Sequence, residues 1–125
     1  MDENRITEGV IGAAIEVHRA LGPGLLESTY QCCLAHELHL RGIAFEQQGA
    51  VGLDYKGLVI ESAYRADFVV LNAVILELKA AQQLEPIHGA QLLTYLRWSG
   101  LKPGLIINFN VRVLRDGIKR IVNNF

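Results

Sequence analysis

The chain is poor in cysteine, in net charge and in long apolar runs, and each shortage excludes a class of protein. Its two cysteines, Cys32 and Cys33, are neighbours in the sequence. Adjacent residues on a helix cannot form a framework disulfide, and two thiols alone do not make a zinc site. We therefore expect both to be reduced thiols, in the core or at an interface of a cytoplasmic protein.

The net charge of −1 lacks the overall basic character of an autonomous, tight nucleic-acid binder. Local clusters and bound metal ions still set the field at a single site, so nucleic acid is not excluded as a partner. No apolar run approaches the ~20 residues of a membrane span. The opening residues, Met-Asp-Glu-Asn-Arg, lack the layout of a signal peptide. We expect no membrane partner.

What the chain does have is ordinary globular composition, with 50% apolar and 20% charged residues among 125. A chain of this length buries roughly two-thirds of its unfolded surface when it folds as one unit. We expect a single domain over residues 1–125, without repeats or low-complexity linkers.

Apolar residues at helical spacing predict three helices. The first covers residues 7–21, and Gly22-Pro23-Gly24 ends it. The second covers about residues 25–41, where Gly42 suits a left-handed C-terminal cap. The third runs from about 86 to 98.

Short apolar or alternating runs predict strands between and after these helices, with turns at Lys56-Gly57 and Asp116-Gly117. A residual segment, 118–122, ends the chain. The order of elements favours an α/β fold, with a mixed, mostly antiparallel sheet that carries helices on its faces. The expected strands are residues 44–48, 50–55, 58–65, 66–71, 74–79 and 105–109.

Charged residues interrupt two of the apolar strands in the middle of the chain. Asp67 precedes the run 68–71, and Glu77-Leu78-Lys79 follows the run 74–76. These charges are costly to bury unless they meet a metal or one another. Glu77 and Lys79 share one strand face, while Leu78 points to the other. Two carboxylates and an ammonium at one sheet edge can hold a divalent cation and activate a water.

Strand parity makes this site a geometric prediction. A two-residue turn, Asn72-Ala73, would put Asp67 and Glu77 on opposite faces of the sheet. A three-residue loop, 71–73, would place Asp67 directly opposite Glu77, whereas a loop of 72–74 would oppose Asp67 to Lys79. We predict a three-residue loop or a bulge, and Asn72 suits it because asparagine tolerates the left-handed conformation.

Helix residues supply further polar candidates. His88, Gln91 and Tyr95 lie on one stripe of the third helix, from which they could orient a water, a phosphate or a ligand. Plain surface positions for Gln91 and Tyr95, and a hydrogen-bonded structural role for His88, stay open. Glu27, early in the second helix, also suits the positive end of the helix dipole, and Tyr30 suits the core.

Basic residues gather near the C-terminal end: Arg112, Arg115, Lys119 and Arg120. They are a candidate patch for the phosphate backbone of a nucleic acid, and a plain solvated face is the alternative.

Together these residues carry a resemblance to a known family. The pattern Asp67-x9-Glu77-x-Lys79 resembles the active-site signature of the PD-(D/E)XK nuclease superfamily, with Ala66 in place of the structural proline. The pair Gln91-x-x-x-Tyr95 resembles the helix motif of its exonuclease-like branch. Gly24-x-x-Glu27-x-x-Tyr30 is similar to the motif that names the GxxExxY family.

The likeness runs from about residue 6 to residue 122 and includes three further segments. They are Tyr64-Arg-Ala-Asp67, Glu77-Leu-Lys-Ala80 and Gly104-Leu-Ile-Ile-Asn108-Phe109. The resemblance implies a restriction-endonuclease-like core.

The resemblance implies that Asp67 and Glu77 bind Mg²⁺ or Mn²⁺, with the Leu78 carbonyl and Glu27 completing the site. Oxygen ligands of this kind favour Mg²⁺ or Mn²⁺ over zinc. Lys79 would position or help to deprotonate the attacking water, and Gln91 and Tyr95 would orient the water or contact phosphate.

The implied function is a Mg²⁺-dependent nuclease that hydrolyses phosphodiester bonds, in DNA rather than RNA. The alternatives are a non-catalytic nucleic-acid-binding or assembly subunit, and an enzyme acting on a small phosphate or nucleotide. The near-neutral charge and the lack of an appended recognition domain favour dependence on dimerisation or on a partner protein.

Overall fold

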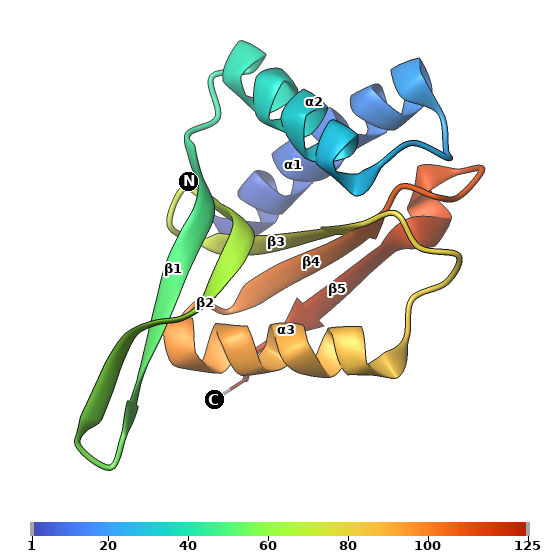
Figure 1. Ribbon diagram of the computed structural model, residues 1–125. Coiled ribbons are helices and arrows are strands. Elements are labelled where there is room, and N and C mark those ends of the chain that lie inside the picture. The colour runs from blue at the N-terminus through green and yellow to red at the C-terminus, as the bar shows by residue number, and fades with distance from the viewer. Residues whose placement is uncertain (1, 125) are drawn as a thin grey trace.

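The computed structural model describes residues 2–124 as a five-stranded sheet between two layers of helix (Figure 1). The strand order is β1-β2-β3-β4-β5, with β3 and β4 parallel and the other neighbours antiparallel. This confirms the predicted mixed, mostly antiparallel α/β fold. The strands are β1 (Phe45–Tyr55), β2 (Leu58–Val70), β3 (Val74–Lys79), β4 (Pro103–Asn108) and β5 (Ile118–Val122).

The three predicted helices are present, with ends that differ by a few residues: α1 (Glu3–Leu21), α2 (Glu27–Leu40) and α3 (Pro86–Ser99). Helix α1 begins earlier than its apolar pattern because the Asp2 carboxylate accepts a hydrogen bond from the Arg5 amide. Gly42 follows α2 with a φ of 69°, the left-handed conformation predicted for it. No helix of residues 2–124 is long and apolar enough to span a membrane.

Each face of the sheet has its own apolar core. Helices α1 and α2 cover one face, where Phe68, Leu76 and Leu78 are fully buried. Helix α3 covers the other face, where Ile75 packs with Leu92 and Leu96 (Figure 1). Residues of even number on β3 therefore face α1 and α2, and those of odd number face α3.

The β1–β2 pair is one long hairpin whose tip extends past α3 (Figure 1). The sequence predicted four shorter strands here, and the structure joins them in pairs. The predicted turn at Lys56-Gly57 is confirmed, with both residues at positive φ. Gln48 has a φ of 54°, yet β1 continues through it and through the predicted break at residue 49. The register between β1 and β2 shifts further along, between Val51 and Leu53.

The connection between β2 and β3 is the predicted three-residue loop. Val70 pairs with Val74, so residues 71–73 form the turn, and Leu71 and Asn72 both adopt left-handed φ values near 50°. Sequence reasoning anticipated this conformation for Asn72 but not for Leu71. The register therefore sets odd-numbered residues of β2 against odd-numbered residues of β3.

The C-terminal segment, which sequence reasoning left without structure, forms the edge strand β5 beside β4. A short 3-10 helix, Leu114–Gly117, precedes it at the predicted Asp116-Gly117 turn.

Helix α3 lies close to β4, because Gly104 of that strand has no side chain. A Cβ at that position would lie 3.0 Å from the Leu92 side chain.

Candidate active site

Asp67 and Glu77 meet between β2 and β3, on the face covered by α3. The ladder between these strands ends with the pair Phe68 and Leu76, and the same register continued by one residue sets Asp67 opposite Glu77. Beyond this pair, the Asp67 side chain and not the β2 backbone accepts the next hydrogen bond from β3. Its Oδ2 accepts a hydrogen bond from the Leu78 amide at 2.9 Å. The structure thus confirms the predicted loop and joins the two acids across one strand pair.

Glu77 is poorly solvated and sits next to a like charge. Burial, the negative charge of Asp67 and a hydrogen bond shared with Asp67 raise its pKa from 4.5 to about 9, although the nearby Lys79 acts in the opposite direction. Its Oε1 is buried and has no hydrogen-bond partner within residues 2–124. A buried carboxylate oxygen without a donor can accept a bond from a bound ion, water or ligand.

Two further groups of β3 face the acids. The Lys79 carbonyl accepts the Phe109 amide, so it points toward β4. Because successive carbonyls alternate along a strand, the Leu78 carbonyl points toward β2 and the Asp67 side. Lys79 itself shares the α3 face with Glu77, and its positive charge partly offsets the negative charge there.

Tyr64 and Tyr95 form an aromatic pair beside the acids. Their rings stack with centroids 3.3 Å apart and an interplanar angle of 16°. Burial raises the pKa of both phenols, and the charges of Glu77 and Asp67 raise it further. The Tyr64 hydroxyl is buried without a hydrogen-bond partner in the described part of the chain.

Sequence reasoning assigned no role to Tyr64. Regular alternation on β2 would put residue 64 on the face opposite to Asp67, but the alternation is interrupted. Ala66 and Tyr64 pack with the α3 cluster, whereas Phe68 packs with the α1 and α2 cluster. The interruption lies between Ala66 and Phe68, at the position opposite Gln48, which has a positive φ.

The remaining residues of the α3 stripe differ in their surroundings. Tyr95 is half-buried against Tyr64, whereas Gln91, one turn earlier, is exposed. His88 is a capping residue: its Nδ1 accepts the Glu85 amide at 3.1 Å, and the Glu85 side chain in turn accepts the His88 amide. This is the structural alternative considered for His88.

Glu27 does not join the two strand acids. It is exposed at the start of α2, where Oε1 accepts a hydrogen bond from Gln31 at 3.4 Å. Residues 2–124 contain no group of three or more His, Cys, Asp or Glu side chains arranged to hold a metal. The expected third carboxylate is therefore not in place, and the position of Glu27 suits the helix dipole.

Tyr30 belongs to the core on the opposite face. It is fully buried and stacks on Phe109, with centroids 4.5 Å apart. Its hydroxyl donates to the Gly22 carbonyl at 2.6 Å and accepts from the Leu25 amide at 3.1 Å. Tyr30 thus stabilises the connection between α1 and α2.

The basic residues near the C-terminal end do not form one patch. Lys119 and Arg120 are consecutive on β5, so their side chains leave opposite faces of the sheet. A Cβ at Gly89 of α3 would lie 3.4 Å from Lys119 Nζ, whereas Arg120 donates to Asn4 of α1 at 3.1 Å. Arg115 lies exposed in the short 3-10 helix.

Asn108 is a supporting residue that sequence reasoning did not single out. It is buried at the end of β4, and its amide pairs with both the N–H and the carbonyl of Ala81. These bonds fix the backbone that leaves β3 after Lys79. Two signals for it were present in the sequence: a polar residue at the end of the apolar run 105–107, and its place in the segment 104–109 that carries the family resemblance.

A comparison with models of protein families gives a match. Residues 4–121 match the family model described as the PD-(D/E)XK nuclease superfamily. No curated protein and no solved structure is a significant match to the chain. Since the family model covers nearly the whole sequence, the chain belongs to the PD-(D/E)XK nuclease superfamily, and its α/β architecture agrees with a restriction-endonuclease-like fold.

Proposed function

We propose that this member of the superfamily is a Mg²⁺-dependent nuclease that hydrolyses phosphodiester bonds, with DNA as the preferred substrate. The observation that carries the proposal is the opposed pair Asp67 and Glu77, with a buried Glu77 oxygen that no donor satisfies. The presence of Lys79 beside this pair favours an active enzyme, because an inactive site does not need all three residues.

The residues present fit a divalent cation. Two carboxylates and the Leu78 carbonyl offer the oxygen ligands that Mg²⁺ and Mn²⁺ prefer. A cation would also favour the ionised form of Glu77, whose pKa is about 9 without one. When bound, Mg²⁺ supplies Lewis-acid stabilisation of the charge that develops on the phosphate. Glu27 would complete the site only if its side chain turned inward from the start of α2.

The chain's own residues supply positioning and charge. Lys79 shares the α3 face with Glu77 and is assigned to hold the attacking water and to offset negative charge on the phosphate in the transition state. Tyr95 is assigned to orient the water or to contact phosphate. Gln91 is assigned to the same task from one turn earlier. Of the basic residues, Lys119 shares the α3 side and is the preferred phosphate contact.

We place the chain in the GxxExxY family within the superfamily, on the strength of Gly24-x-x-Glu27-x-x-Tyr30. The net charge of −1 supports a further proposal, that recognition of nucleic acid depends on dimerisation or on a partner protein.

One observation favours a second candidate function, a non-catalytic nucleic-acid-binding or assembly subunit. The described residues lack the three-carboxylate group that a complete metal centre would offer. An inactive subunit would bind nucleic acid without cleaving it, whichever metal ion is added.

The binding of a small phosphate substrate by an enzyme of the third class would depend little on salt, because few counterions are released.

The test is a cleavage assay on single- and double-stranded DNA and RNA of matched sequence, with Mg²⁺, with Mn²⁺ and with chelator. We expect metal-dependent cleavage of DNA by the parent and its loss in Lys79→Ala. Binding that falls steeply with salt, without cleavage in either metal, would assign the chain to the non-catalytic class.

A further inference from the structure

A small apolar pocket opens beside the stacked pair Tyr64 and Tyr95. Its volume is about 200 Å³, and its walls come from the β1–β2 hairpin and from α3. Tyr64 and Tyr95 belong both to this pocket and to the surroundings of Glu77. We call it the aromatic pocket; it is lined by Val51, Gly52, Leu53, Ala63, Tyr64, Thr94, Tyr95 and Trp98.

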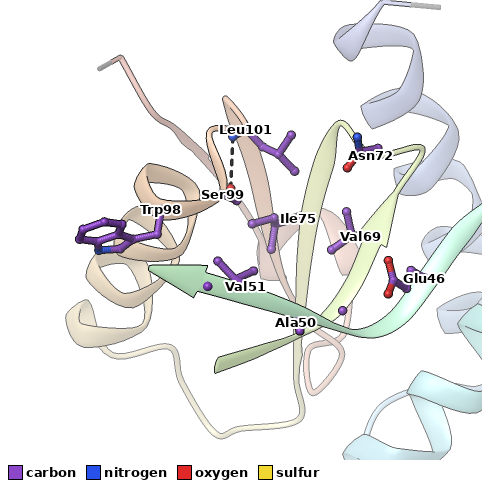
Figure 2. Close-up of a pocket in the computed structure, with 11 residues that line it drawn as sticks. Glu46, Ala50, Val51, Val69, Asn72, Ile75, Trp98, Ser99 and Leu101 are labelled. Carbon is purple, nitrogen blue, oxygen red and sulfur yellow. Dashed lines mark hydrogen bonds between the residues drawn. The ribbon is translucent and has the colours of Figure 1, made fainter. Parts of the chain in front are cut away.

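Trp98 forms the outer wall of this pocket and is 49% exposed. It also borders a neighbouring pocket of about 280 Å³, in which Ser99 Oγ accepts the Leu101 amide (Figure 2). Figure 2 shows Trp98 at one end of that second pocket and Glu46 at the other. The aromatic pocket is the better candidate for a substrate group, because its lining includes the two tyrosines that lie beside Glu77.

The shape and chemistry of the aromatic pocket select a narrow class of ligand. Its volume lies below the ~300 Å³ at which pockets begin to hold drug-sized molecules, so it suits a single ring system. Aromatic and aliphatic walls favour a flat, weakly polar group. In a nucleic acid that group is the base, and bases stack on aromatic side chains without regard to sequence.

We propose that the aromatic pocket binds one unpaired base of the substrate, next to the phosphate held at Asp67 and Glu77. A base inside a duplex is stacked on both faces, and it reaches a side pocket only after unpairing. The substrate class is therefore single-stranded nucleic acid or frayed duplex ends. This inference rests on the proposed nuclease function, since it uses the acid pair to place the phosphate.

Trp98 is the only tryptophan of the chain, so its fluorescence reports directly on this pocket. The metal-free protein, in chelator and at low salt, is titrated with a single-stranded DNA oligonucleotide and with an abasic oligonucleotide of the same length. We expect quenching by the base-bearing strand and little quenching by the abasic strand. Equal quenching by both, or none by either, would overturn the proposal.

Substitutions test the stacking contribution by anisotropy of labelled strands. Trp98→Leu keeps an apolar side chain but removes the ring, and Trp98→Phe restores a ring. We expect Trp98→Leu to weaken binding of the base-bearing strand by about tenfold or more, with recovery in Trp98→Phe. Binding of the abasic strand should not change.

The matched control is Ile87→Ala, an exposed apolar position at the other end of α3. It should leave binding of both strands as in the parent. If Trp98→Leu weakens both strands equally, or neither, the pocket does not hold a base.

Failure of this inference is distinguishable from failure of the proposed function. Suppose that the parent cleaves DNA in Mg²⁺ and that the Trp98→Leu variant cleaves single-stranded and double-stranded DNA as fast as the parent does. That result would refute the base pocket alone. Absence of cleavage together with base-dependent quenching of Trp98 would instead refute the nuclease proposal and keep the pocket.

Discussion

The two faces of the sheet handle buried polar groups in opposite ways. On the α1 and α2 face, the Tyr30 hydroxyl has two hydrogen-bond partners and lies among fully buried apolar residues. On the α3 face, the Tyr64 hydroxyl and Glu77 Oε1 are buried without partners in residues 2–124. The hydroxyl of the first face is satisfied within the protein, whereas the second face keeps polar groups that a ligand can satisfy.

The contrast is sharpest between neighbouring residues on β3. Leu76 and Leu78 are fully buried in the apolar cluster, and Glu77 between them faces the other way. Substitutions along this one strand should therefore separate loss of stability from loss of activity.

The largest expected effect is on catalysis. Lys79→Ala should lower cleavage by about 10²–10³-fold, because a preorganised charge is lost from the transition state. The melting temperature should stay close to that of the parent, since Lys79 is at the end of β3. Measured together, cleavage rate and melting curve decide this point. Full activity in Lys79→Ala, with Asp67→Ala inactive, would show that the lysine has been given the wrong role.

The next effect is on stability alone. Leu76→Ala should reduce the free energy of unfolding by about 2–5 kcal/mol, because it leaves a cavity under α1 and α2. Urea denaturation of Leu76→Ala and Lys79→Ala side by side measures the difference. Equal stability of the two variants would contradict the division of labour between the faces.

Glu77→Gln should stabilise the metal-free protein in a pH-dependent way. The folded pKa of about 9 lies above the ordinary value of 4.5, so the folded state holds a proton that the unfolded state releases. Glu77 therefore lowers the free energy of unfolding progressively as pH rises from about 4.5 to about 9. The neutral amide has no such dependence.

Melting curves in chelator at pH 5 and pH 8 measure this effect. For a chain of this length, about 1 kcal/mol corresponds to about 4 °C. We expect Glu77→Gln to melt several degrees above the parent at pH 8 and close to it at pH 5. A uniform shift at both pH values would assign the change to packing and not to the carboxyl proton.

The smallest effect compares the two tyrosines. Tyr30→Phe removes the partner of the Gly22 carbonyl and of the Leu25 amide, and should cost about 1–2 kcal/mol. Tyr64→Phe removes a hydroxyl without a partner and should change stability by less than about 0.5 kcal/mol. Chemical denaturation of both variants provides the comparison, and equal costs would remove the distinction between the hydroxyls.

The sequence predicted those features that depend on local periodicity and parity. The three helices, the Lys56-Gly57 turn and the three-residue loop 71–73 all follow from spacing and from turn chemistry, and the structure confirms them. A shared site for Asp67 and Glu77 was the premise from which a three-residue loop or a bulge was predicted, and the register of β2 and β3 agrees with that premise.

Features that depend on long-range geometry were not predictable. Tyr64 joins the site because the alternation of faces along β2 breaks between Ala66 and Phe68, and the sequence pattern does not reveal that break. Lys119 and Arg120 looked like members of one cluster, but neighbouring positions on a strand face opposite sides. Glu27 was assigned to the metal by its motif, but the direction of its side chain depends on where α2 begins, and it is exposed there.

The most direct test of the central claim is the melting temperature of the metal-free protein at pH 8 before and after addition of Mn²⁺ or Mg²⁺. A ligand present at about 100 times its dissociation constant stabilises the folded state by about 2.7 kcal/mol, a rise of about 10 °C for this chain. The parent should show such a rise and Asp67→Asn should show none. An unchanged melting temperature of the parent in millimolar Mn²⁺, or an equal rise in Asp67→Asn, would contradict the metal site between Asp67 and Glu77.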